Sequence, residues 1–121
     1  MNVQEIQTIL EKQVTLHKSL SVIVKEKTNF IIKQDVKALT ASLQKEQSHI
    51  AAISALETKR VEAMEKSGHA ARSIEEIAGS FSEYSILIPF QKQLIDIIQD
   101  IKYANDLNNQ LLTQSLQLIH T

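Results

Sequence analysis

Residues 33–64 read KQDVKALTASLQKEQSHIAAISALETKRVEAM, and this stretch predicts how the chain folds. Asp35 is a suitable N-cap, because its carboxylate can accept hydrogen bonds from the first free backbone N–H groups of a helix. The apolar residues after it fall on heptad a and d positions, which lie on one face of a helix. They are Val36, Leu39, Leu43, Ile50, Ile53 and Met64. A helix from Val36 to about Lys66 is therefore predicted, and other helices have to cover its apolar stripe.

A first long helix is predicted before this stretch, from Asn2 to Ile32. Its apolar face is interrupted by Gln13, His17 and Lys27. Side chains with long stems can keep their polar ends in water, so these interruptions favour a partly open bundle over a sealed core. The turn between the two helices is short, and residues 1–66 are therefore expected to form an antiparallel helical hairpin.

A short connector helix is predicted after the hairpin, over residues 73–79. Gly68 is suited to the left-handed conformation that commonly follows the last turn of a helix. Ser73 and Glu76 have the spacing of a capping box, in which each side chain bonds the backbone N–H near the other. Gly79 follows closely and is expected to end this helix early.

The last helix is expected over residues 84–120. Ser85 is its predicted N-cap, since that start places Pro89 in the first turn, where the missing N–H matters little. The apolar residues cover about half of the circumference, which is wider than the stripe of about 100° that one contact requires. The helix is expected either to sit centrally against two others or to keep apolar surface for a partner's helix.

Three asparagines lie among the leucines of this last helix: Asn105, Asn108 and Asn109. At a core position an asparagine lowers stability but can fix the register of packed helices or the choice of partner. On the flank of the helix it is simply solvated, and the sequence leaves both readings open.

These elements predict an all-α fold, an antiparallel bundle or coiled coil of three long helices plus one short connector helix. A chain of 121 residues favours a single domain, expected over residues 1–121. Two glycines and one proline supply too few turn formers for a sheet with many hairpins.

The charges disfavour a nucleic-acid partner. The chain has 13 Lys and Arg against 14 Asp and Glu, and aromatic residues make up only 4%. The basic residues are scattered, and few aromatic rings are present to stack on bases. No run approaches the roughly 18 apolar residues of a membrane span, and no signal-peptide pattern opens the chain, so a cytoplasmic protein without membrane insertion is expected.

Candidates for catalytic or metal-binding residues are few, and none is predicted to act as one. The sequence lacks Cys, a Gly-rich phosphate loop and a G-x-S-x-G motif. Glu46 and His49 form one E-x-x-H step, whereas a di-metal bundle uses two such steps and two further Glu. We therefore expect no enzyme, no metal site and no cofactor; a metal-dependent bundle enzyme is the least favoured alternative. His69, next to Gly68, is expected to be exposed to solvent.

A family resemblance rests on three segments and on the order of the elements. The segments are DVKAL at residues 35–39, the register from Lys45 and Glu46 to LETKR at residues 56–60, and NQLLTQSL at residues 109–116. The order is a long hairpin, a short connector and a long last helix. In these features nearly the whole chain resembles the FlgN-type flagellar export chaperones.

The resemblance implies a holdase that works without ATP. It implies that the last helix binds the C-terminal helical region of hook-associated proteins, which form the hook–filament junction. Clients would be kept unassembled and delivered to the type III export gate and its ATPase complex. No aromatic residue follows Tyr103 in this chain, so the resemblance does not extend to gate docking through an aromatic tail. The client-binding residues implied are Ile97, Ile101, Leu107, Asn109, Leu111, Leu112 and Leu116.

A second function from another class uses the same apolar face. A structural or adaptor coiled coil would pair with its own copies, for example as a homodimer. The two hypotheses differ in the partner that the last helix accepts, which is either a client helix or a second copy of this chain.

Overall fold

Over the residues that it describes, the computed structural model is all-helical, with three long helices, one short helix and one 3-10 helix. It describes the backbone of residues 2–70 and 72–120, and the side chains of residues 3–70 and 72–115. The elements are α1 (Asn2–Lys33), α2 (Val36–Lys66), α3 (Ile74–Ser80), the 3-10 helix η1 (Ser82–Leu87) and α4 (Ile88–His120).

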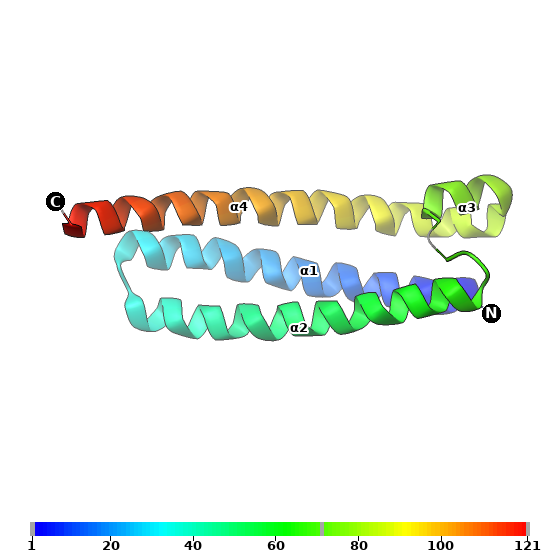
Figure 1. Ribbon diagram of the computed structural model, residues 1–121, viewed down its shortest axis with the longest axis horizontal. Helices are drawn as coiled ribbons and strands as arrows, with labels where there is room; N and C mark the ends of the chain where they lie inside the picture. The colour runs from blue at the N-terminus through cyan, green and yellow to red at the C-terminus, as the bar shows by residue number, and fades with distance from the viewer. Residues whose placement is uncertain (1, 71, 121) are drawn as a thin grey trace.

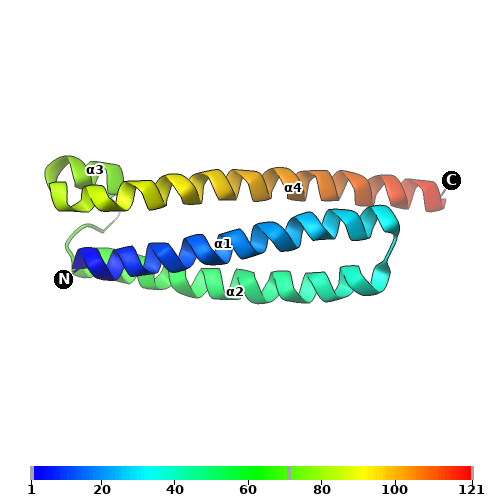
Figure 2. The ribbon, with the colours of Figure 1, turned by 180° about the vertical axis from the view of Figure 1, so that it is seen from behind.

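The three long helices lie side by side, with α1 between α2 and α4 (Figures 1 and 2). Consecutive long helices run in opposite directions, so α4 runs in the same direction as α1. Within the described residues, no Cα atom of α2 lies within 8 Å of a Cα atom of α4. The three long helices therefore form an open layer with α1 in the middle, in which α2 and α4 do not pack against each other.

The helix ends depend on local signals that were correctly predicted. Asp35 Oδ1 accepts a hydrogen bond from the Ala38 N–H at 3.1 Å, and Ser73 Oγ accepts one from the Glu76 N–H at 3.1 Å. The return bond from the Glu76 side chain is not among the hydrogen bonds of the described residues, so only half of the predicted capping box forms there. The predicted N-caps Asp35 and Ser73 are confirmed, whereas the third, Ser85, is not.

Gly68 adopts the predicted left-handed conformation, with φ 79°. Its own N–H donates to the Glu65 carbonyl, and the following His69 N–H donates to the Met64 carbonyl at 2.9 Å. These two bonds form a Schellman motif, which satisfies two of the last free carbonyls of α2. The turn directs the chain back toward the long helices.

The predicted start of the last helix was wrong. Residues 82–87 form the 3-10 helix η1, Ser85 lies within it, and α4 begins at Ile88. An α-helix that began at Ser85 would need an N–H on Pro89 to bond the Ser85 carbonyl, and proline has none. The Ile88 N–H bonds that carbonyl instead, one residue earlier. Pro89 does lie in the first turn of α4, as predicted.

The core lies on α1. At the end that carries α3, Ile6, Ile9 and Leu10 are buried against Met64, Ile77, Tyr84 and Leu87. Farther along α1, Leu20 and Val24 pack against Ile101 and Ala104 of α4. Both clusters place the buried face of α1 against its neighbours, so burial of α1 is the main apolar contribution to stability.

The prediction that other helices cover the α2 stripe was wrong for half of its residues. Val36 is 72% exposed, and Leu43 and Ile50 are also exposed, whereas Met64 is buried. Leu39 and Ile53 are half-buried. The cause is that, among the long helices, only α1 packs on α2, so one side of the stripe stays open.

Polar side chains fix the register between α1 and α2. Lys27 Nζ bonds both carboxylate oxygens of Glu46, at 2.9 and 3.2 Å, and these side chains are only 10% and 14% exposed. His49 Nε2 lies 2.7 Å from Ser19 Oγ. Glu46 and His49, the two residues of the E-x-x-H step, therefore both bond side chains of α1. The negative charge of Glu46 on α2 pairs with the positive charge of Lys27, which interrupts the apolar face of α1.

A buried asparagine fixes the register between α1 and α4. Asn108 Nδ2 donates to the Val24 carbonyl at 3.0 Å, and Asn108 Oδ1 accepts from Thr28 Oγ1. Asn108 is 1% exposed, while the predicted site residue Asn109 is exposed. Of the two readings left open for the asparagines, the core role applies to Asn108.

The expectation that His69 is exposed was wrong. The His69 side chain is buried, and its ring centroid lies 5.1 Å from the ring centroid of Phe81 and 5.1 Å from that of Tyr84. The Schellman turn places the imidazole against Phe81 and Tyr84. His69 thereby ties the segment that joins α2 to α3, which we call the connector (residues 69–70 and 72–74), to the start of η1.

We expect the buried Lys27–Glu46 pair to contribute measurably to stability. The Lys27→Met variant leaves a carboxylate unpaired between α1 and α2, so the free energy of unfolding should fall by about 3 kcal/mol. The double variant Lys27→Met with Glu46→Leu should recover most of this loss, because no unpaired charge remains. Urea unfolding at pH 7, followed by far-UV circular dichroism, measures both changes.

Lys25 is the matched control for this experiment. Its ion pair with Asp100 has an N–O distance of 2.7 Å, but the two side chains are 57% and 50% exposed. The Lys25→Met variant should therefore lose clearly less stability than Lys27→Met. Equal losses in the two single variants would contradict a special role for the buried pair.

Candidate functional site

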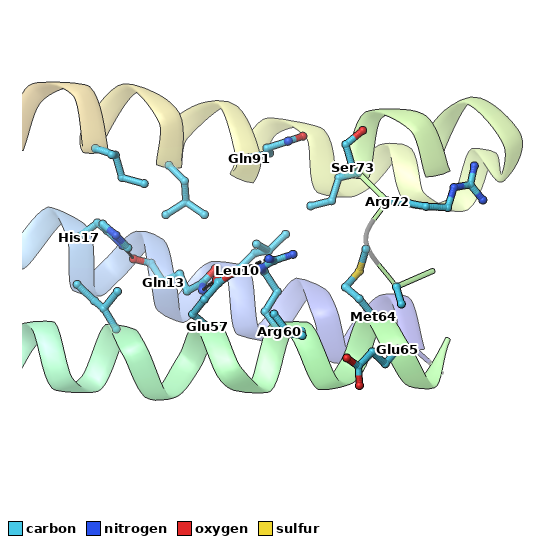
Figure 3. A pocket seen from close by; sticks show the side chains of 16 residues that line it. Leu10, Gln13, His17, Glu57, Arg60, Met64, Glu65, Arg72, Ser73 and Gln91 are labelled. Carbon is cyan, nitrogen blue, oxygen red and sulfur yellow. Dashed lines mark hydrogen bonds and ion pairs between the residues drawn. The ribbon is translucent and has the colours of Figure 1, made fainter. Parts of the chain in front are cut away.

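A cavity of about 780 Å³ lies between α2 and α4, above α1 and beside the connector (Figure 3). We call it the groove. The α1 residues Leu10, Gln13 and His17 line it together with residues of α2, α4 and the connector. The others are Ile53, Glu57, Arg60, Val61, Met64, Glu65, Ala70, Arg72, Ser73, Ile74, Gln91, Leu94 and Ile98.

One side of the groove continues along α2 as a row of exposed apolar residues. Val61 lines the groove, and Ile50, Leu43 and Val36 precede it at steps of eleven, seven and seven residues. These steps return a helix to nearly the same side, so the four residues share one edge. All four are exposed. We call this row the α2 edge.

The other side continues along α4 as a row of two polar and two apolar residues. Gln91 and Ile98 line the groove, and Asn105 and Leu112 follow at steps of seven residues. Ile98 is 48% exposed, and Leu112 is also exposed. We call these four residues the α4 edge. The two edges border the space that a fourth helix would fill if the layer were completed to a bundle.

The groove has one closed end and one open end. Ala70, Arg72, Ser73 and Ile74 of the connector line it at the α3 end. At the other end the two edges run to Val36 and Leu112, beside the α1–α2 turn, and no connector residue lines the groove there. A helix lying in the groove would therefore meet the connector at one end only.

A polar network lies part-way along the groove, between His17 and the connector end (Figure 3). Glu57 accepts a hydrogen bond from Gln13 Nε2 at 3.0 Å and bonds from Arg60 at 2.6 to 3.1 Å. The Arg60 hydrogen bond is the main reason why the pKa of Glu57 lies below its ordinary value of 4.5; partial burial opposes this shift and Gln13 adds to it. The same contact raises the pKa of Arg60. The charges of this pair therefore neutralise each other within the chain.

The predicted client-binding residues do not form one free surface. Ile101 is buried against α1, and Ile97 packs on the same cluster. Leu107 is exposed and Leu111 is half-buried. Both lie on the side of α4 opposite the α4 edge, the side that also carries Asp100 seven residues before Leu107. Among these residues only Leu112 lies on the α4 edge. The side chain of Leu116 lies outside the side chains that the structure describes.

The exposure of the α2 edge was not predicted, because apolar residues at heptad positions usually mark a covered face. A usable signal was present: Val36, Leu43 and Ile50 are separated by seven residues, as are Gln91, Ile98, Asn105 and Leu112. Such spacing shows that residues share a side of a helix, but it does not show which neighbour covers that side.

The described side chains include no group of three or more His, Cys, Asp or Glu that could hold a metal ion. None of the described helices is long and apolar enough to cross a bilayer. The site that the structure presents is therefore a mainly apolar groove that contains the paired Glu57 and Arg60 and, near the connector, the exposed Glu65 and Arg72. Such a groove suits the binding of an amphipathic helix.

Comparison with known proteins gives one result for the chain. The family model described as FlgN protein matches residues 1–121, the whole length. Neither a curated protein nor a solved structure gives a significant match.

The Glu57 network predicts a dependence of stability on pH. Because the pKa of Glu57 is lowered in the folded chain, its stabilisation is present above about pH 4.5 and is lost as the pH falls below that value. The Glu57→Gln variant should melt below the unmodified chain at pH 7, and the difference should shrink at pH 3. Half of the Glu57 side chain is exposed, so the effect stays under about 1 kcal/mol.

Thermal unfolding by circular dichroism at the two pH values measures this effect. Glu62 is an exposed carboxylate on the same helix, and Glu62→Gln serves as the control. A difference between Glu57→Gln and the unmodified chain that stays constant from pH 7 to pH 3 would contradict the assignment.

Proposed function

The chain belongs to the FlgN family over its whole length, and on this basis we propose that it holds hook–filament junction proteins unassembled before their export. FlgN family members are flagellar export chaperones that bind flagellar substrate proteins. The finer proposal is that this chain acts in the cytoplasm as a holdase and captures the C-terminal helical region of its client.

We place the client helix in the groove between the α2 and α4 edges. The single observation that supports this most directly is that exposed apolar residues of both edges, the whole α2 edge and Ile98 and Leu112 of the α4 edge, border or continue a cavity of about 780 Å³. An amphipathic helix from a client would cover both edges and complete a four-helix arrangement around the apolar space. Binding by burial of preformed apolar surface requires no nucleotide and no catalytic group.

This placement changes the binding residues implied by the family resemblance. Leu112 remains part of the surface, and Ile98 and the α2 edge join it. Asn109 is exposed within three residues of Leu112 and remains a candidate for contact at the rim. Ile97 and Ile101 act indirectly in this proposal, since they hold α4 on α1 and so keep the groove open to the client.

The alternative of a homo-oligomeric coiled coil is less well supported. The most apolar side of each long helix already packs against another helix of the same chain. On α2 and α4, the apolar residues that stay exposed lie along the edges. A second copy could therefore offer an edge but not a whole apolar helix face. The docking of an edge on an edge buries less apolar surface than the docking of a separate amphipathic helix.

Substitutions on the two edges test the proposal. Ile50→Asp on α2 and Ile98→Asp on α4 each place a charge on the apolar surface that the client covers. We expect each to weaken binding of the C-terminal fragment of a hook–filament junction protein from the same bacterium by at least about ten-fold. Isothermal titration calorimetry with the purified full chain gives the Kd values. Helicity should be retained, because both side chains are about half exposed in the free chain.

Tyr103→Asp is the control, since this α4 residue is 76% exposed and belongs to neither edge. It should bind the fragment as the unmodified chain does. If Ile50→Asp binds normally while Ile98→Asp does not, the client lies on α4 alone and the groove is not its site.

The predicted α4 residues are tested in the same assay. In the groove proposal Leu112→Asp weakens binding, whereas Leu107→Asp, on the opposite edge of α4, leaves binding unchanged. The reverse result would restore the outer edge of α4 as the client surface. Sedimentation equilibrium of the chain without client addresses the homo-oligomer, which would be favoured by a stable dimer that Ile50→Asp dissociates.

A further inference from the structure

Gln91 is a polar residue on the α4 edge with an unused hydrogen-bond acceptor. Its Oε1 atom is buried and has no hydrogen-bond partner, a state shared by only two other side-chain atoms of the described residues. A buried acceptor without a partner destabilises the free chain, and native proteins contain few of them. Gln91 also lines the groove, where a bound helix would lie.

Two donors across the groove from Gln91 are already used (Figure 3). Gln13 Nε2 donates to Glu57, and Arg60 donates to the same carboxylate from Nε and Nη2. The neighbours of Gln91 on its own helix that line the groove, Leu94 and Ile98, are apolar. Gln91 is therefore an acceptor on an otherwise apolar α4 wall of the groove, and the Gln13, Glu57 and Arg60 side chains opposite it bond one another.

We propose that Gln91 selects the client by accepting a hydrogen bond from an uncharged donor, a hydroxyl or an amide, on the bound helix. The inference rests on the proposed function and identifies the chemistry of the client at one position. Gln91 is only half-buried and lines the groove, so a client helix seated there lies against its amide group. An uncharged donor fits this position, because the groove-lining neighbours of Gln91 on α4, Leu94 and Ile98, are apolar and would leave the charge of a client cation desolvated.

The bond would give selectivity among helices of similar apolar pattern. A helix with a donor at this position satisfies Gln91, whereas a helix with Leu or Ala there leaves the acceptor unpaired inside a closed interface. Rejection of the apolar analogue by an unpaired polar group is a common source of specificity. Apolar edges alone would accept many amphipathic helices.

A double-mutant cycle tests the inference. Each Ser, Thr, Asn and Gln in the C-terminal fragment of the hook–filament junction protein is replaced by Ala, and Kd is measured with the full chain and with Gln91→Leu. At one client position we expect Ala to weaken binding to the full chain by about ten-fold. The same Ala should weaken binding to Gln91→Leu, which lacks the acceptor, by less than about two-fold. The Gln91→Glu variant retains an acceptor and should keep most of the ten-fold response.

Gln99→Leu is the matched control, since Gln99 is an exposed glutamine on the same helix. It should leave the ten-fold response unchanged. In the absence of client, Gln91→Leu should raise Tm, because it removes an unpaired buried acceptor, and this measurement also shows that the variant folds.

The outcomes separate this inference from the proposed function. If the fragment binds the full chain but no client position responds differently to Gln91→Leu, the selective role of Gln91 is overturned and the chaperone function stands. If the fragment does not bind the full chain at all, the proposed function fails, and the role of Gln91 fails with it.

Discussion

The packing of α1 between two helices that do not approach each other determines the rest of this structure. Among the described residues, every contact between long helices is made by α1, which buries its apolar residues and bonds both neighbours through polar side chains. Lys27 holds α2 through Glu46, and the Val24 carbonyl and Thr28 hold α4 through Asn108. Because α2 and α4 each bury one side on α1, each keeps an edge uncovered. A closed bundle would use those edges internally, whereas here they border a groove.

The sequence predicts those parts of the fold that depend on one helical turn. Asp35, Ser73 and Gly68 end or begin helices through bonds to residues three to five positions away, so their roles can be predicted without tertiary information. The environment of His69 could not be predicted in this way, because Phe81 and Tyr84 reach it only after the connector folds back. The start of α4 was in principle predictable, since Pro89 itself prevents an α-helix from Ser85.

The candidate site was predictable only in part, and for a physical reason. Heptad spacing identifies apolar residues that share a side, but it does not state which side the chain covers for itself. Ile101 and Leu112 both look like free surface in the sequence, yet α1 covers the first and leaves the second exposed. Neighbouring asparagines show the same limit: one residue turns a helix by about 100°, so Asn108 is buried while Asn109 faces solvent.

The connector at one end of the groove bears on how a bound helix would leave. Residues 70 and 72–74 add contacts at the α3 end, while beyond them a seated helix touches only the long helices. Such a helix would peel away from the weaker end, turn by turn, and each step would break only a small share of the interface. A secretion machine that pulls on that end meets a series of low barriers. Tight holding and easy unloading are then compatible in one interface, because the first depends on the sum of the contacts and the second on the largest single step.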